Sequence, residues 1–185
     1  MAIVTIDQAV LGYQNPVIGP ISTTIDVGER VGILGPNGCG KSTLLNYFSG
    51  VSHLFSGSIH IKESVSIAYQ PQHPVHPTEI PIIGSEYLKL MAADSESIPE
   101  RLKLLLAKRV DQLSGGQFQI LSTWANLASK GELVLLDEPT NNLDPEAIEL
   151  LVDTILAMPE SHGLMVVSHD SHFIQRIANK VVEIG

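Results

Sequence analysis

The chain has 185 residues, of which 44% are hydrophobic and 5% aromatic. This length predicts one domain over residues 1–185 with a sizeable core, and the aliphatic composition favours a parallel sheet under helices over an aromatic-rich β-sandwich. The net charge of −9 argues against direct binding to nucleic acid, because phosphate backbones are bound by Lys and Arg.

The sequence also argues against a disulfide-stabilised or membrane-spanning chain. It has a single cysteine, which excludes an internal disulfide framework. Its apolar runs are far shorter than the roughly 20 residues that a membrane-spanning helix needs. Met1 is not followed by the basic and apolar regions of a signal peptide. We therefore expect a cytoplasmic chain.

The first half of the chain is predicted to be mainly strands. They are expected at residues 2–27 with a break at 12–20, at 30–34, at 57–61 and at 65–69. A helix is predicted at Lys41–Phe48, directly after a glycine-rich loop. The dense prolines between Pro71 and Pro81 predict an exposed loop.

The second half is predicted to begin with helices and then to alternate between strands and helices. Two short helices are expected within residues 83–108, broken near 93–99, and a longer helix at 114–129. After these we expect strands at 132–137, 163–168 and 180–184, and helices at 145–157 and 170–178. Strands that alternate with helices imply an α/β fold with a mainly parallel sheet.

Residues 35–43 fit the G-x-x-x-x-G-K-[ST] pattern of a phosphate-binding loop. Its glycines allow backbone N–H groups to face phosphates, and the N-terminal end of the following helix attracts anions. Lys41 is expected to reach the β- and γ-phosphates of a nucleotide, and Ser42 to bind Mg²⁺. The residues expected to contact the nucleotide are Gly35, Pro36, Asn37, Gly38, Cys39, Gly40, Lys41, Ser42 and Thr43.

An apolar strand predicted to end at Asp137 is followed at once by Glu138. Two adjacent carboxylates at the end of a buried strand are costly unless a cation compensates their charge. With a phosphate-binding loop in the same chain, bound Mg²⁺ is the expected cation.

Residues 113–117 read Leu-Ser-Gly-Gly-Gln and supply a second phosphate-binding element. Ser114 suits a helix N-cap, and Gly115 and Gly116 expose backbone N–H groups at the helix start. Together with the phosphate-binding loop, this pentapeptide resembles the signature of the ATP-binding cassette (ABC) ATPases, over nearly the whole chain. The resemblance implies their P-loop NTPase fold, with a parallel sheet, a small antiparallel β subdomain and a helical subdomain at about 73–130.

The resemblance also implies a role for each catalytic residue. Asp137 would hold Mg²⁺ through water, and Glu138 would be the general base that polarises the attacking water. Gln72 would sense Mg²⁺ and that water, with Gln70 as a competing candidate. His169 would contact the γ-phosphate and Glu138.

Further family positions imply how the nucleotide is enclosed. Tyr13 would stack on adenine, and Thr43 would contact the α-phosphate. In the family the signature binds the γ-phosphate held by the opposite subunit, so an ATP-dependent head-to-tail homodimer or heterodimer is implied. The D-loop of the family, matched here by Asn141-Asn-Leu-Asp144, would link the two ATP sites across the dimer. The residues that would act across this dimer to bind ATP are Ser114, Gly115, Gly116, Gln117 and Asp144.

The chain departs from the family pattern in two places. Family members carry Arg three residues after the signature glutamine and again further on, whereas this chain has Ile120 and Ala125 with Trp124 between them. We expect these changes to affect turnover and dimer contacts. The helical subdomain is short, and the end at Gly185 suits either a minimal cassette or part of a longer protein.

Three other residues have open interpretations. Cys39 lies beside a helix start, where a thiolate would be stabilised. It is either a tolerated small side chain or a thiol whose alkylation would inhibit the ATPase. His73 and His76 lie in the proline-rich loop without a cysteine or paired acid, which is more typical of solvated histidines than of a metal site.

Three functions remain for such an ATPase. The favoured one is the nucleotide-binding subunit of an ABC transporter, peripheral at the cytoplasmic face of a membrane and docked on membrane-spanning subunits. The sequences of residues 138–144 and 168–174 also resemble those of ABC-F proteins, which act on ribosomes. ABC-F proteins, however, join two cassettes by a basic linker, whereas this chain has one cassette and no such linker. A clamp of the DNA-repair kind is less favoured because no sustained heptads are present.

Overall fold

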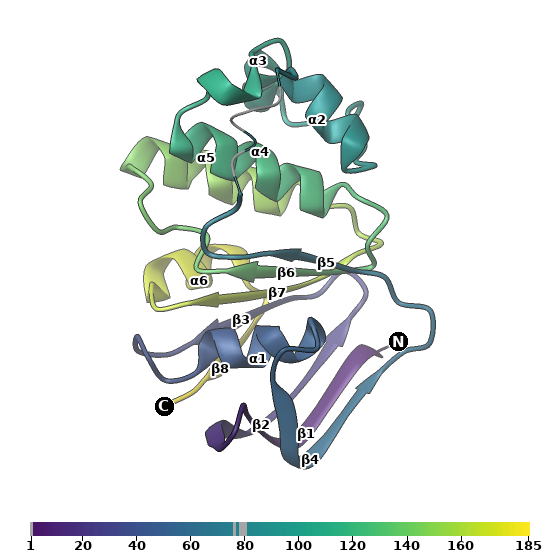
Figure 1. The fold of residues 1–185 in the computed structure, drawn as a ribbon, viewed down its shortest axis with the longest axis vertical. Coiled ribbons are helices and arrows are strands. Elements are labelled where there is room, and N and C mark those ends of the chain that lie inside the picture. Colours follow the sequence, from purple (N-terminus) through teal and green to yellow (C-terminus); the bar gives the residue numbers. More distant parts are fainter. Residues whose placement is uncertain (1, 76, 78–80) are drawn as a thin grey trace.

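The computed structural model describes residues 2–75, 77 and 81–185. Two sheets and two groups of helices are stacked along the long axis of the molecule (Figure 1). The predicted alternation of strands and helices in the second half of the chain is confirmed, as is the parallel central sheet.

A small antiparallel sheet lies at one end of the molecule (Figure 1). Its strand order is β2-β1-β4, with β1 at Ala2–Gly12, β2 at Pro16–Asp26 and β4 at His53–Ile61. The predicted break at 12–20 was too long, since only residues 13–15 lie outside the strands. Pro20 is accommodated because β2 is an edge strand, where a missing N–H leaves no partner unpaired.

The central sheet has the order β5-β6-β7-β3-β8, and every neighbouring pair is parallel. Its strands are β3 at Arg30–Leu34, β5 at Ile67–Gln70, β6 at Leu133–Asp137, β7 at Gly163–Ser168 and β8 at Lys180–Glu183. The strand predicted at 65–69 begins two residues later because Val65 still belongs to a turn, in which its N–H donates to the carbonyl oxygen of Lys62.

Two cores lie on opposite faces of this central sheet. Along β6, Leu133 and Leu135 face the core shared with the antiparallel sheet, whereas Val134 and Leu136 face the helical side. This alternation is the period of two that a strand buried on both faces imposes. The central sheet is therefore covered on both faces. Because its faces are closed, a site can form only at the polar ends of its strands.

The helix α1 at Lys41–Phe48 lies between the two sheets, where Leu44 and Leu45 join the first core. On the opposite face lie α4 at Gly115–Leu127, α5 at Pro145–Leu156 and α6 at Ser171–Ile177 (Figure 1). Beyond them are the short helices α2 at Gly84–Leu90 and α3 at Lys103–Leu106, with 3-10 turns at 100–102 and 110–112. None of the helices in the described ranges could span a membrane.

Candidate functional site

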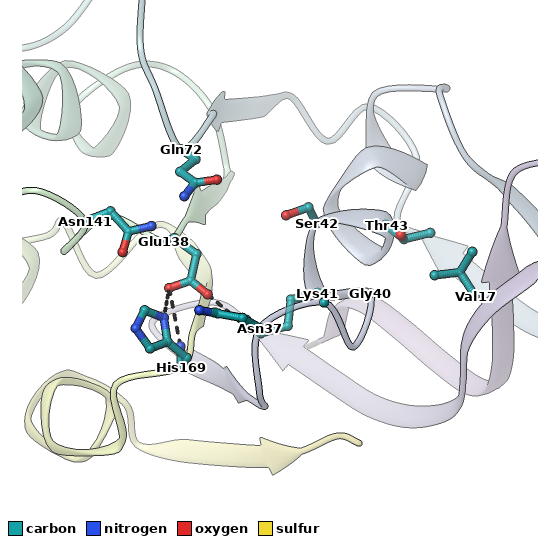
Figure 2. Close-up of a pocket in the computed structure, with 11 residues that line it drawn as sticks. Val17, Asn37, Gly40, Lys41, Ser42, Thr43, Gln72, Glu138, Asn141 and His169 are labelled. Atoms are coloured by element: carbon teal, nitrogen blue, oxygen red, sulfur yellow. Dashed lines mark hydrogen bonds and ion pairs between the residues drawn. The ribbon is translucent and has the colours of Figure 1, made fainter.

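A cavity of about 400 Å³ opens at the carboxyl ends of the parallel strands, where α/β sheets bind ligands. Residues far apart in the sequence meet around it (Figure 2). Its lining is Val17, Asn37, Gly38, Gly40, Lys41, Ser42, Thr43, Gln72, Glu138, Asn141 and His169. The structure thus brings together most of the predicted phosphate loop with Gln72, Glu138 and His169.

The glycine-rich loop wraps around the amino group of Lys41. Gly40 has a φ of 98° and caps α1, and a Cβ at this position would lie 2.8 Å from the Cβ of Ile18, so only glycine fits. Lys41 Nζ donates to the carbonyl oxygens of Gly35 at 2.8 Å and Pro36 at 3.0 Å. The loop therefore holds a buried positive charge at the start of the helix.

The carboxylate of Glu138 lies between two partners from other elements (Figure 2). Its Oε1 is 3.0 Å from Lys41 Nζ, and its Oε2 is 2.8 Å from His169 Nδ1. The backbone N–H of His169 also donates to Oε2 at 3.3 Å. Glu138 itself has a left-handed backbone with a φ of 44°, which is rare for a residue with a side chain. A strained backbone thus presents this carboxylate to the cavity.

Asp137 lies beside Ser42, at the carboxyl end of β6. Ser42 Oγ donates to Asp137 Oδ1 at 3.1 Å. Burial raises the pKa of Asp137, and the hydrogen bond from Ser42 partly opposes this rise. Tyr69, which the sequence analysis missed, donates its hydroxyl to Asp137 Oδ2 at 3.4 Å, and burial together with Asp137 raises the pKa of Tyr69 to about 12. The only signal for Tyr69 in the sequence was its place near the end of a strand.

The two glutamines at the end of β5 point to different places. Gln72 lines the cavity, whereas Gln70 is only 1% exposed and donates its side-chain amide to the carbonyl oxygen of Gln119 at 3.4 Å. Of the two candidates, only Gln72 is therefore placed beside Ser42 and Glu138.

Several predicted contacts lie outside this cavity lining. Tyr13 is 42% exposed and its hydroxyl accepts a hydrogen bond from Asn46 Nδ2 at 2.8 Å, while Val17 lines the cavity instead. Pro36 and Cys39 line separate cavities formed with the last residues of the chain. Val17 was missed by the sequence analysis because it reaches the cavity only through tertiary packing.

The signature segment has the local geometry that its sequence predicts. Ser114 is the N-cap of α4, and its Oγ accepts a hydrogen bond from the N–H of Gln117 at 3.2 Å. Asp144 likewise caps α5 and accepts from the N–H of Ala147 at 2.8 Å. Ser114, Gln117 and Asp144 line a second cavity, of about 410 Å³, that does not include the phosphate loop.

The remaining signature glycines also lie apart from the phosphate loop. Gly116 lines this second cavity, and both Gly115 and Gly116 line a third cavity together with His73. His76 lies outside the described residues. Within one chain, the signature residues therefore lie apart from the cavity at the phosphate loop.

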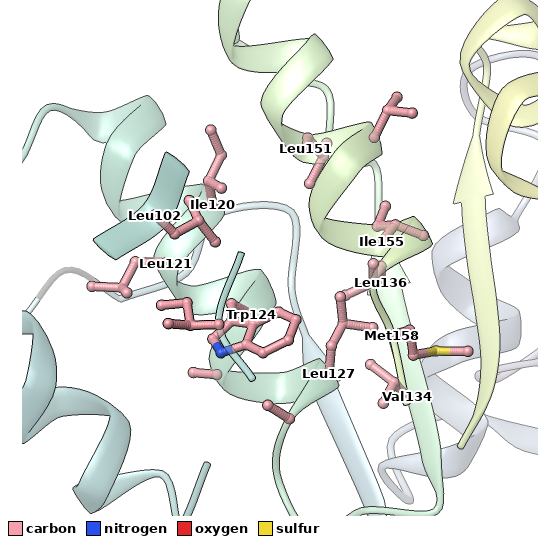
Figure 3. Packing of buried hydrophobic residues seen from close by; sticks show 14 of the residues in the cluster. Leu102, Ile120, Leu121, Trp124, Leu127, Val134, Leu136, Leu151, Ile155 and Met158 are labelled. Atoms are coloured by element: carbon pink, nitrogen blue, oxygen red, sulfur yellow. The ribbon is translucent and has the colours of Figure 1, made fainter. Parts of the chain in front are cut away.

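The packing of α4 explains the missing arginines (Figure 3). Ile120 is 1% exposed and Ala125 is fully buried, so charged side chains there would have to enter the helical core. Trp124 is also fully buried, and its indole Nε1–H donates to the carbonyl oxygen of Asp94 at 3.1 Å. Apolar packing thus surrounds α4 at both positions for which the resemblance implies basic groups.

Known proteins resemble this chain in both sequence and fold. Residues 18–141 match the family model described as ABC transporter. The zinc import ATP-binding protein ZnuC of Psychrobacter arcticus is 34% identical, over 91% of this chain and 74% of its own length. The energy-dependent translational throttle protein EttA of Escherichia coli K12 is 35% identical, over 90% of this chain but 32% of its own length.

A solved structure supports the same fold. An ABC transporter ATP-binding protein from Pyrococcus furiosus has a TM-score of 0.82 and 24% identity, and the match covers 98% of this chain and 96% of that chain. The predicted ABC ATPase fold is confirmed by this likeness. The match to the family model and the similarity to ZnuC also indicate the activity. This chain belongs to the ABC transporter family and is a nucleotide-binding subunit that binds and hydrolyses ATP.

Proposed function

We propose that this chain hydrolyses ATP with Mg²⁺ in a head-to-tail dimer and thereby powers transport through membrane-spanning partner subunits. The observation that carries the proposal is the meeting of Lys41, Glu138 and His169 at one cavity while the signature faces another. The ATP-dependent dimer, the membrane partners and a place at the cytoplasmic face of the membrane are all parts of this proposal.

The residues beside the cavity suit Mg²⁺. A serine hydroxyl and a carboxylate are the hard oxygen ligands that this ion prefers, and Ser42 already lies within hydrogen-bond distance of Asp137. Burial disfavours the charged form of Asp137, which a cation would reverse. We assign Ser42, Asp137 and the amide of Gln72 to this ion, which when bound neutralises charge on the phosphate oxygens.

The hydrolytic step is assigned to Glu138. Its carboxylate accepts a proton from a water while the water oxygen attacks the γ-phosphorus and the bond to the bridging oxygen of ADP breaks. His169 lies against Oε2 of Glu138 and so orients this base. Lys41 and the loop N–H groups stabilise the charge on the phosphate oxygens, which is the main route of catalysis in phosphoryl transfer.

The signature residues are assigned to the ATP held by a second subunit. Ser114, Gly115, Gly116 and Gln117 lie at the start of α4 and line cavities apart from their own phosphate loop, so a facing subunit is needed for them to reach a γ-phosphate. Asp144, at the start of α5 in the same cavity, would link the two sites. The adenine would lie near Tyr13 and Val17, at the edge of α1.

The test is to purify Glu138→Gln protein with MgATP from its native cells and to identify what is bound to it. Blocking hydrolysis should trap the closed dimer with its partners. Membrane-spanning subunits are expected, and the name of the zinc import relative makes metal-ion importers the first to examine. Lys41→Ala protein, which should bind nucleotide weakly, is the control.

A second candidate function follows from the similarity to EttA, which is named as a translational throttle protein and matches 90% of this chain. In that case ribosomal proteins and rRNA would co-purify in an ATP-dependent way. That result would overturn the transporter proposal while leaving the ATPase assignments of Glu138 and Lys41 intact.

A further inference from the structure

We propose that Gln119, a buried amide on the signature helix, is a positioning residue that holds the catalytic base Glu138. Gln119 lies two residues after the last signature residue and is only 7% exposed. Its Nε2 donates to the carbonyl oxygen of Pro139 at 3.1 Å. One hydrogen bond therefore joins the signature helix to the residue that directly follows Glu138.

This hydrogen bond lies where the backbone needs support. Glu138 has a φ of 44°, and a non-glycine residue in this region persists only where the surroundings hold it there. On one side, the N–H of Glu138 donates to the carbonyl oxygen of Val167 at 2.9 Å. On the other side, Gln119 holds the carbonyl of Pro139. Within the turn, the N–H of Asn141 donates to the carbonyl oxygen of Glu138 at 3.2 Å. These bonds together fix the turn that points the Glu138 carboxylate between Lys41 and His169.

A second amide ties the same point of α4 to the strand that leads to Gln72. Gln70 donates to the carbonyl oxygen of Gln119 at 3.4 Å, and its own Oε1 accepts from Asn126 Nδ2 at 3.5 Å. Gln70 and Asn126 are 1% and 5% exposed. Buried amides such as these are costly to leave unpaired, so the cluster resists separation of α4 from β5 and from the end of β6.

The hydrolytic step itself uses none of these three amides, so their effect on it must be through position. Gln119 is placed to transmit a movement of the signature helix to the Pro139 carbonyl and so to Glu138. This inference rests on the proposed role of Glu138 as the base. It predicts that the amide of Gln119 affects turnover more than nucleotide affinity.

The first test compares Gln119→Met, which keeps the size of the side chain and removes its donor, with Gln175→Met at an exposed site on α6. We expect kcat of Gln119→Met to fall about 10- to 100-fold, the effect of small misplacements of catalytic groups. KM and the affinity for MgATP should stay within about twofold, because uniform binding is not affected. Gln175→Met should behave as wild type.

A second variant guards against misfolding. Gln119→Ala removes the same donor but suits a helix and leaves space instead of an apolar side chain. It should show the same fall in kcat with an unchanged KM. A kcat equal to that of wild type in either folded variant would overturn the inference.

A double-mutant comparison separates this inference from the proposed function. If Gln119 acts through Glu138, adding Gln119→Met to Glu138→Ala should lower the residual rate no further. A further fall of the same size as in the wild-type background would show that Gln119 acts elsewhere. A Glu138→Gln protein that turns over at the wild-type rate would instead remove the base itself and so refute the proposed function.

Discussion

Lys41 Nζ and Glu138 Oε1 are 3.0 Å apart, and their side chains are 5% and 8% exposed. The same ammonium group also donates to two carbonyl oxygens of its own loop. In this conformation the carboxylate occupies the place beside Lys41 that a γ-phosphate is expected to take. We therefore expect nucleotide binding to exchange one anion for another at the same ammonium group.

This competition makes a prediction about affinity. Replacing Glu138 with Gln removes the competing negative charge, so Glu138→Gln should bind MgATP about tenfold more tightly than wild type, a change of about 1.4 kcal/mol. Titration with a fluorescent ATP analogue would measure it. The exposed Glu160→Gln variant is the matched control. An affinity equal to or weaker than that of wild type would contradict the competition.

The same pair predicts an effect on stability. Lys41→Ala leaves a buried carboxylate without its cation, so the free energy of unfolding of the nucleotide-free protein should fall by about 3 kcal/mol. Urea unfolding followed by circular dichroism would measure this loss. The double variant Lys41→Ala/Glu138→Gln should recover much of it, because no uncompensated charge remains. Equal stabilities of the single and double variants would show that the ion pair is not the cause.

We expect the ionised carboxylate of Asp137 to lower the stability of the nucleotide-free fold while it serves its proposed function. Burial raises the pKa of this carboxyl in the folded state above its ordinary value of 3.8. At pH values between the ordinary pKa and the raised pKa, the folded state therefore binds more protons than the unfolded state. The free energy of unfolding of the nucleotide-free protein should therefore decrease as pH rises through that window, and stay lowered above it.

Asp137→Asn removes that charge while keeping a polar group beside Ser42. At neutral pH the variant should melt a few degrees above wild type and lose Mg²⁺-dependent ATPase activity. Differential scanning calorimetry between pH 4 and pH 8 and a phosphate-release assay would measure both effects. A lower melting temperature for Asp137→Asn than for wild type would mean that the ionised carboxylate stabilises the fold.

Trp124 is expected to hold the helical core together. Trp124→Ala should lower the free energy of unfolding by about 3–5 kcal/mol, as for other large aromatic side chains in cores. Trp124→Phe keeps most of the packing but leaves the carbonyl oxygen of Asp94 without the indole donor, so a loss of about 1–2 kcal/mol is expected. Chemical denaturation followed by circular dichroism would measure both losses. A Trp124→Phe variant as stable as wild type would show that the Asp94 hydrogen bond contributes nothing.

The sequence by itself determined the elements whose signals are local. The helix at Lys41–Phe48 and the strand at Arg30–Leu34 have the predicted bounds, because a glycine cap and a short apolar run depend only on neighbouring residues. The N-cap of α4 at Ser114 was also predictable, since its partner Gln117 is three residues away. The parallel sheet followed from the order of strands and helices.

Tertiary structure decided which side chains share a cavity. Gln70 and Gln72 are two residues apart, yet only the position of α4 buries the first against Gln119 and leaves the second facing the cavity. The ion pair joins Lys41, at the start of α1, to Glu138, directly after β6, so no local pattern could predict it. Such contacts depend on how the elements pack in three dimensions. The spacing of residues along the sequence does not specify the distances between side chains that this packing brings together.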